Sequence, residues 1–165
     1  MPINQSFLQE FEQESASTRK ILQRVPEEHF DWKPHEKSFT LGRLATHIAE
    51  LSGYISTALT TNELDFSIRE YVPRQAATSS ELMQIFEENF SKSKEELQKA
   101  TDDVFMQKWK LRNGDHIIFD LPKSAVLRTF AINHLIHHRA QLSVYLRLLN
   151  VPVPGMYGPS ADEPM

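Results

Sequence analysis

Four stretches of the chain carry apolar residues at the three- and four-residue spacing of an amphipathic helix. These predicted helices span about Asn4 to Arg24, Leu41 to Thr60, Ser79 to Ala100 and Lys123 to Asn150. Pro26 follows the first helix, and the capping-box pattern Thr78-Ser79-Ser80-Glu81 opens the third, with a hydroxyl at the cap and a carboxylate three residues later. Because each helix has an apolar stripe to bury, the four are expected to form a four-helix bundle.

The segment between the third and fourth predicted helices has strand character. The runs Trp109-Lys110-Leu111-Arg112 and His116-Ile117-Ile118-Phe119 flank Asn113-Gly114-Asp115, and Asn-Gly between β-prone runs is a strong hairpin signal. The long connection through Val72-Pro73 would let the second and third helices run parallel. We therefore predict an all-α fold, a four-helix bundle with a small β-hairpin between the third and fourth helices, as one domain of residues 1–165.

Histidines occupy positions within two of the apolar stripes. The stripe on the fourth helix consists of Leu127, Ala131, His134, His138, Gln141, Tyr145 and Leu148. The stripe on the second consists of Leu44, His47, Leu51, Tyr54 and Ala58. His134 and His138 lie one turn apart on one helix face, so both can bind one divalent ion, and His47 can reach it from another helix. Shared metal ligation would satisfy three imidazoles whose burial is otherwise costly. The alternative is that each histidine is a hydrogen-bonded core residue or lies at an end of the bundle.

The composition narrows the functional classes. The chain has no cysteine, which excludes disulfides, thiolate metal ligands and a cysteine nucleophile. The net charge is -4 and there is no long basic run, so we expect no nucleic-acid partner. No stretch approaches the roughly 18 apolar residues of a membrane span, and the N-terminus lacks the pattern of a signal peptide. We therefore expect a cytoplasmic protein with no membrane partner.

Three parts of the sequence resemble motifs of the DinB/YfiT-like family. Trp32-Lys33-Pro34, followed by Ser38-Phe39-Thr40-Leu41-Gly42-Arg43-Leu44-Ala45-Thr46-His47-Ile48-Ala49-Glu50, is similar to the family's first metal-ligand region. His134-Leu135-Ile136-His137-His138-Arg139-Ala140-Gln141-Leu142 is similar to the second, with Ala140 where glycine is commoner. The tail from Pro154 to Glu163 resembles tails in one branch of the family, and the order and spacing match over essentially the whole chain.

The resemblance implies an up-down-down-up four-helix bundle with a three-histidine divalent metal site, often in a homodimer. The residues at the matching positions are His47, His134 and His138. Characterised relatives include thiol-dependent S-transferases and a thiol-dependent isomerase, and many others carry a general assignment as metal-dependent hydrolases. The resemblance therefore suggests an enzyme but not its substrate.

Three neutral imidazoles would leave a position open on one zinc- or nickel-like ion per chain. The ion could lower the pKa of a water bound at that position, or it could hold an incoming thiolate there. Both reactions need the same three protein ligands. Because the chain has no cysteine, a thiol would have to come from a low-molecular-weight cofactor. We expect a metal-dependent hydrolase or thiol S-transferase acting on a small molecule. The alternative is a non-catalytic stress-response or binding protein with a structural or vestigial metal site.

Several neighbours of the proposed ligands have two interpretations. Glu50 follows His47 by three residues and could act as catalytic base or as an acceptor for the ligand, although a solvated helix carboxylate is the commoner case. His137 is expected outside the ligand set, behind the ligands or facing the bundle. Arg139 could bind an anionic substrate, but a surface salt bridge is the more ordinary role. Gln141 could orient a ligand.

The first predicted helix carries more apolar surface than one core contact needs. Phe7, Leu8, Phe11 and Ile21 spread widely around it. An apolar face left over from the bundle would be covered by a second copy of the chain. We therefore expect a homodimer.

Overall fold

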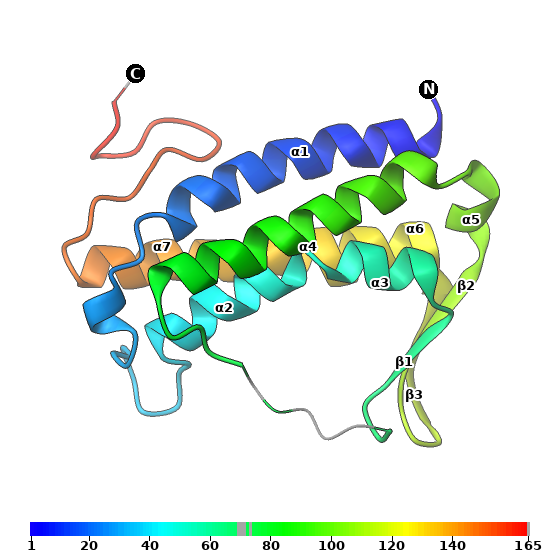
Figure 1. Cartoon of the computed structure of the whole chain (residues 1–165), viewed down its shortest axis with the longest axis horizontal. Coiled ribbons are helices and arrows are strands. Elements are labelled where there is room, and N and C mark those ends of the chain that lie inside the picture. Colours follow the sequence, from blue (N-terminus) through cyan, green and yellow to red (C-terminus); the bar gives the residue numbers. More distant parts are fainter. Residues whose placement is uncertain (69–71, 73, 165) are drawn as a thin grey trace.

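Four long helical segments pack side by side in the computed structural model, which describes residues 1–68, 72 and 74–164 (Figure 1). The first is α1 (Ile3–Leu22) and the third is α4 (Ser79–Lys99). The second comprises α2 (Leu41–Leu51) and α3 (Tyr54–Thr60), and the fourth comprises α6 (Lys123–Val126), the π-helical segment η2 (Leu127–Asn133) and α7 (His134–Leu148). Short helices η1 (Glu27–His29) and α5 (Asp102–Met106) lie in the connections.

The four segments run up, down, down and up, as the family resemblance implies. The first and fourth segments run in one direction in Figure 1, and the second and third in the other. α1 packs against α4 and α7, and α2 packs against the same two helices, which closes the bundle. None of the described helices is both long and apolar enough to cross a membrane.

The predicted cap of the third helical segment is present, and the second segment begins with a similar cap. Thr40 caps α2 by accepting a hydrogen bond from the Arg43 backbone N–H at 3.2 Å. Thr78 caps α4 by accepting from the Glu81 backbone N–H at 3.1 Å, and the Glu81 carboxylate accepts in return from the Ala77 backbone N–H at 2.8 Å. These bonds satisfy backbone donors that a helix start leaves unpaired, so both starts are determined locally.

The prediction of one helix from Leu41 to Thr60 is wrong at Ser52 and Gly53, where the helix breaks. Two α4 side chains support the break. Ser93 donates to the Ser52 carbonyl at 2.6 Å, and Asn89 donates to the Ala49 carbonyl at 3.2 Å. A Cβ atom at Gly53 would lie 2.5 Å from the Asn89 side-chain oxygen, so a larger residue here would displace the Asn89 side chain from its place against the break.

The predicted β-hairpin is confirmed, and it belongs to a three-stranded sheet. β2 (Lys108–Asn113) pairs antiparallel with β3 (His116–Pro122), and Gly114 takes a positive φ of 58° in the turn. The sequence did not predict β1 (Glu63–Asp65), which pairs parallel with β2. β1 has only three residues, of which two are acidic, so it has no periodic signal and depends on β2 for its hydrogen bonds.

The apolar stripe predicted for the fourth helix is wrong beyond Ala131. The buried positions of α7 are Leu135, Arg139, Leu142 and Leu146, each one residue later than the predicted stripe. The π-helical segment explains the shift, because a wider turn adds one residue before the regular helix resumes. His134 and His138 therefore flank the core stripe and are half-buried instead of pointing into the core.

The apolar residues of α1 that suggested a dimer pack largely against the core of the same chain. Phe7, Phe11 and Ile21 are buried in the core, and Leu8 is half-buried against it. The pattern on the first helix is therefore explained by the bundle itself. The homodimer stays a prediction that rests on the family resemblance.

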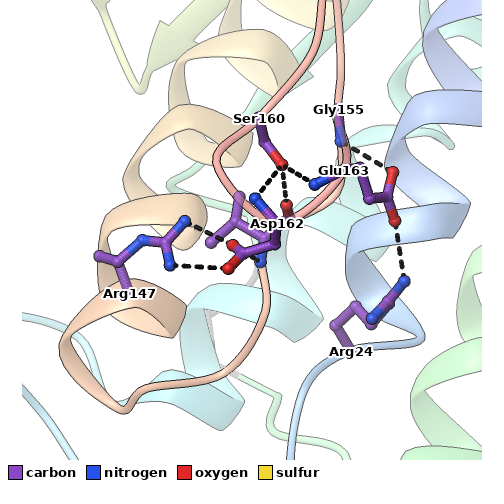
Figure 2. A network of polar contacts seen from close by, with 7 residues as sticks. Arg24, Arg147, Gly155, Ser160, Asp162 and Glu163 are labelled. Carbon is purple, nitrogen blue, oxygen red and sulfur yellow. Dashed lines mark hydrogen bonds and ion pairs between the residues drawn. The ribbon is translucent and has the colours of Figure 1, made fainter. Parts of the chain in front are cut away.

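The C-terminal tail folds back beside the ends of α1 and α7 and is held by ion pairs (Figure 2). Asp162 accepts two hydrogen bonds from Arg147 of α7, and Glu163 accepts one at 2.9 Å from Arg24, which follows α1. The Ser160 hydroxyl accepts from the backbone N–H groups of both acidic residues and so folds the end of the tail into a turn. The tail therefore links the C-terminal ends of α1 and α7.

Candidate metal centre

The structure places the three histidines proposed as metal ligands side by side. His47 comes from α2, and His134 and His138 come from the first two turns of α7. Their ring centroids are 4.8 to 5.2 Å apart, and one nitrogen from each ring lies within 4.8 Å of the others. Three ring nitrogens this close can hold a single metal ion between them.

A hydrogen bond of His138 indicates which of its two ring nitrogens faces the shared space. The Gln141 amide oxygen lies 2.7 Å from His138 Nδ1, and because that oxygen only accepts, Nδ1 carries the proton and Nε2 carries the lone pair. The Nε2 atoms of His134 and His138 are 3.0 Å apart. In the tautomer set by Gln141, the lone pair of His138 Nε2 faces His134 Nε2, so both atoms are placed to bind one cation.

Both rings are neutral near pH 7. Burial lowers the pKa of His138 to about 4, although its hydrogen bond to Gln141 raises it. Burial also lowers the pKa of His134, helped by the neighbouring His47. Because only neutral imidazole can bind a metal, these two side chains are ready to act as ligands at physiological pH.

The Glu50 carboxylate lies beside the histidine cluster and interacts with His47 and Arg43. Burial raises its pKa, but His47 and Arg43 lower it by more, so the net pKa is below the ordinary value and Glu50 is ionised. Its Oε2 lies 3.1 Å from an Arg43 nitrogen and 3.8 Å from His47 Nδ1. Nδ1 is buried without a hydrogen-bond partner among the described residues. Glu50 is therefore partly buried and paired, which contradicts the solvated alternative.

A cavity of about 440 Å³ opens onto the cluster. Its described lining consists mainly of aromatic side chains: Phe39, Arg43, His47, Tyr54, Phe66, Phe130 and His134. Glu50 is not among them and borders a separate hollow of about 280 Å³ beyond Tyr54. The cavity thus reaches two of the three histidines directly, whereas Glu50 approaches the cluster from the side of His47.

Four other histidines lie outside the cluster. His29, His35 and His116 are exposed. His137 is also exposed, so the expectation that it might face the bundle is wrong. Its ring centroid is 5.0 Å from that of His138, but it does not join the three converging rings.

Arg139 is buried, so the expected surface salt bridge is wrong. Its guanidinium lies 2.5 Å from the Glu14 carboxylate and also donates to the Glu14 carbonyl at 2.8 Å and to the Tyr157 hydroxyl. Only 3% of the Arg139 side chain is exposed. Arg139 therefore joins α7 to α1 and to the tail, on the side of the helix away from the histidines.

The sequence did not identify three aromatic residues of the cavity, Phe39, Phe66 and Phe130. Phe39 and Phe66 lie in connections without a periodic pattern, and Phe130 lies in the π-helical segment. The only available signal was the closeness of Phe39 and Phe130 to the histidine motifs. The cavity depends on their convergence, which requires the tertiary structure.

Comparison with known proteins gives consistent results. The sequence family described as "DinB family" matches residues 1–165. An uncharacterized protein of Bacillus subtilis (strain 168), YrdA, is 28% identical, with 95% of this chain and 89% of YrdA covered. A crystal structure of a DinB-like protein from Bacillus cereus ATCC 10987 superposes with a TM-score of 0.73 at 26% identity, over 93% of this chain and 97% of that one. The DinB-like protein YjoA of Bacillus subtilis has a TM-score of 0.72 at 17% identity, over 92% and 97%, and so supports the fold.

Proposed function

The chain belongs to the DinB family, and from this premise we propose that it is a divalent-metal-dependent enzyme that acts on a small molecule as a hydrolase or a thiol S-transferase. The observation that carries the proposal is the convergence of His47, His134 and His138. Their imidazoles leave room on an ion for a further ligand, and the aromatic cavity leads to them.

The donor set suits zinc or nickel. Imidazole nitrogen is a favoured ligand of both ions, and the chain has no thiolate that would compete. The Nε2 atoms of His134 and His138 are 3.0 Å apart, and Gln141 engages the other nitrogen of His138, so the pair fits one shared cation. When bound, the cation would supply Lewis acidity and an open coordination position beside the cavity.

The residues around the histidines would position them for this task. Gln141 holds His138 in the tautomer that exposes Nε2. Arg43 holds Glu50 ionised, and the Glu50 carboxylate faces His47 Nδ1, where it can fix the orientation of that ring. We assign Glu50 this positioning role in preference to that of a catalytic base, because it does not line the cavity.

Hydrolysis and thiol transfer would use the same three ligands. A thiol transferase would take its nucleophile from a low-molecular-weight thiol, since the chain has no cysteine. The alternative of a purely structural metal site is less consistent with a cavity that reaches His47 and His134. A structural site would be expected to be closed on all sides by protein.

Metal content tests the proposal directly. We expect about one ion per chain after loading with zinc or nickel and removal of excess metal, measured by elemental analysis. His47→Gln and His138→Gln should each lose most of it, whereas His137→Gln, at the exposed neighbouring histidine, should retain it. Equal metal content in all variants would refute the proposed site.

The two reaction classes can then be separated by substrate. The metal-loaded protein would be assayed against a panel of esters and amides, and separately against electrophiles with and without added low-molecular-weight thiols. Turnover that requires both metal and thiol would identify a transferase, and metal-dependent cleavage without thiol would identify a hydrolase. Activity unchanged in His138→Gln would exclude the cluster as the active site.

A further inference from the structure

We propose that the cavity beside the histidines binds the uncharged, apolar and preferably aromatic part of a small organic substrate. This inference deepens the proposed function, on which it rests, by naming the class of substrate. The apolar part would lie among the aromatic side chains, and the reactive end would face His47 and His134. The argument comes from the shape, lining and charge of the cavity.

Two phenylalanines that line the cavity are exposed to solvent. Phe39 is 48% exposed in the connection before α2, and Phe66 is 40% exposed directly after β1. Large apolar side chains usually avoid water, and when several converge on one concavity they indicate a binding site. Here they meet at the same cavity from segments far apart in the sequence.

The wall formed by Phe130 is supported by the π-helical segment. Phe130 stacks on Tyr54 of α3 with ring centroids 5.0 Å apart and planes inclined by 4°. Phe130 also contacts the ring of His134, with centroids 6.0 Å apart. π-Helical turns are frequent at functional sites, and this turn immediately precedes two of the proposed ligands. The aromatic wall is thus continuous with the histidine cluster.

The charges in the cavity are balanced without a ligand. Arg43 is the cationic side chain in the described lining apart from the histidines. It forms an ion pair with Glu50 at 3.1 Å, and its guanidinium lies 5.4 Å from the centroid of Phe39. Because Glu50 matches this charge, the cavity does not require an anionic ligand. The volume of about 440 Å³ is within the range of about 300 to 1,000 Å³ typical of small-molecule sites.

A neutral fluorescent probe, N-phenyl-1-naphthylamine, tests the cavity independently of metal. The protein as purified would be titrated with the probe, in wild-type form and as Phe66→Ser, Phe39→Ser and Ile117→Ser. Ile117 is 52% exposed on β3 and does not line the cavity, so its variant is the matched control. We expect Phe66→Ser and Phe39→Ser to weaken binding about tenfold, and the control to bind like wild type. Thermal unfolding would show that each variant is folded.

Several results would overturn the inference. Absence of probe binding, equal binding by Phe66→Ser and wild type, or equal losses in Phe66→Ser and Ile117→Ser would each show that the cavity does not select apolar ligands. These outcomes do not depend on the metal site.

A pair of metal-binding ligands then tests the orientation. Acetohydroxamate and benzohydroxamate share one metal-binding group, and only the second carries a phenyl ring. In the metal-loaded wild type, calorimetry should give about tenfold tighter binding for benzohydroxamate, and Phe66→Ser should abolish this preference without changing acetohydroxamate binding. An unchanged preference in Phe66→Ser would overturn the inference. If acetohydroxamate itself did not bind, the proposed open metal site would fail while the probe result still decided the cavity.

Discussion

At the scale of single residues, the hydrogen bond between Gln141 and His138 has the greatest consequence for the cluster. The Gln141 oxygen is 2.7 Å from His138 Nδ1 and so determines which nitrogen faces His134. Gln141 is itself exposed and has no evident role in the core. Partners of this kind fix the tautomer and orientation of a metal-binding histidine.

We predict that Gln141→Ala weakens metal binding by about 10- to 100-fold, because His138 loses the acceptor that holds its ring. Gln141→Glu, which keeps an oxygen acceptor, should bind metal at least as well as wild type. Competition with a chromophoric chelator would measure the affinities. Asn133→Ala is the control, since Asn133 is an exposed amide beside the same helix. Identical affinity in Gln141→Ala and wild type would remove Gln141 from the site.

At the scale of elements, the contact between α1 and α7 contains a buried ion pair. Arg139 and Glu14 have 3% and 9% of their side chains exposed, and Thr18 adds a further acceptor for the guanidinium at 3.1 Å. Removal of one partner from such a pair leaves an uncompensated charge in the interior. The pair therefore makes the approach of these two helices sensitive to single substitutions.

We predict that Arg139→Ala lowers the free energy of unfolding by about 3 to 5 kcal/mol, measured by urea denaturation. Arg147 lies on the same helix, and its ion pair with Asp162 of the C-terminal tail is exposed, so Arg147→Ala should cost about 1 kcal/mol or less. The double variant Arg139→Met with Glu14→Leu should recover much of the stability, because no unpaired charge remains. Similar losses in Arg139→Ala and Arg147→Ala would contradict the buried role.

The carboxylate of Asp65 holds the short strand β1 against the neighbouring hairpin. Asp65 accepts hydrogen bonds from the backbone N–H groups of Gly114 at 3.0 Å and Ser67 at 2.9 Å, and pairs with Arg112 at 3.0 Å. These hydrogen bonds, of which the one from Gly114 has the largest effect, lower the Asp65 pKa from 3.8 to about 2. Asp65 thereby connects β1 to the turn between β2 and β3, next to Phe66 at the cavity.

We predict that Asp65→Asn destabilises the protein in a pH-dependent way. Because the folded pKa of Asp65 is below its unfolded value, its contribution is fully present well above pH 3.8 and is lost as the pH falls toward about 2. The stability difference between wild type and Asp65→Asn should therefore be constant near neutral pH and shrink below pH 3.8. Chemical denaturation across this range would measure it. A difference that grows in acid would contradict the assignment.

At the scale of the whole molecule, the expected homodimer needs a surface other than α1. Val144 and Leu148 are each 57% exposed, and they lie one turn apart on α7. Exposed apolar residues at this spacing can form a helix contact with a second copy of the chain.

We predict a dimer mass by light scattering at micromolar concentration, and a monomer for Val144→Glu with Leu148→Glu. Ile117→Glu, at an exposed apolar position of β3, should leave the dimer intact. A monomer mass for the wild type would refute the dimer, and a dimer that survives the double substitution would exclude this face of α7.

Local patterns in the sequence were sufficient for much of the architecture. The helix starts at Thr40 and Thr78 and the hairpin turn at Asn113-Gly114 follow from interactions within a few residues. The pairing of His134 with His138 follows from one helical turn. Such features can be predicted because their causes lie within one segment of the chain.

Other features required the tertiary structure, because their causes lie on different elements. The break at Gly53 depends on Asn89 and Ser93 of α4, and the burial of Arg139 depends on Glu14 of α1. The π-helical segment rotates α7 by about one residue, which no fixed helical period anticipates. By itself, the sequence determined the four helical segments, the β-hairpin and which histidines can meet. Packing between elements decided the register of α7 and the cavity that the histidines face, because both arise from contacts between residues distant in the chain.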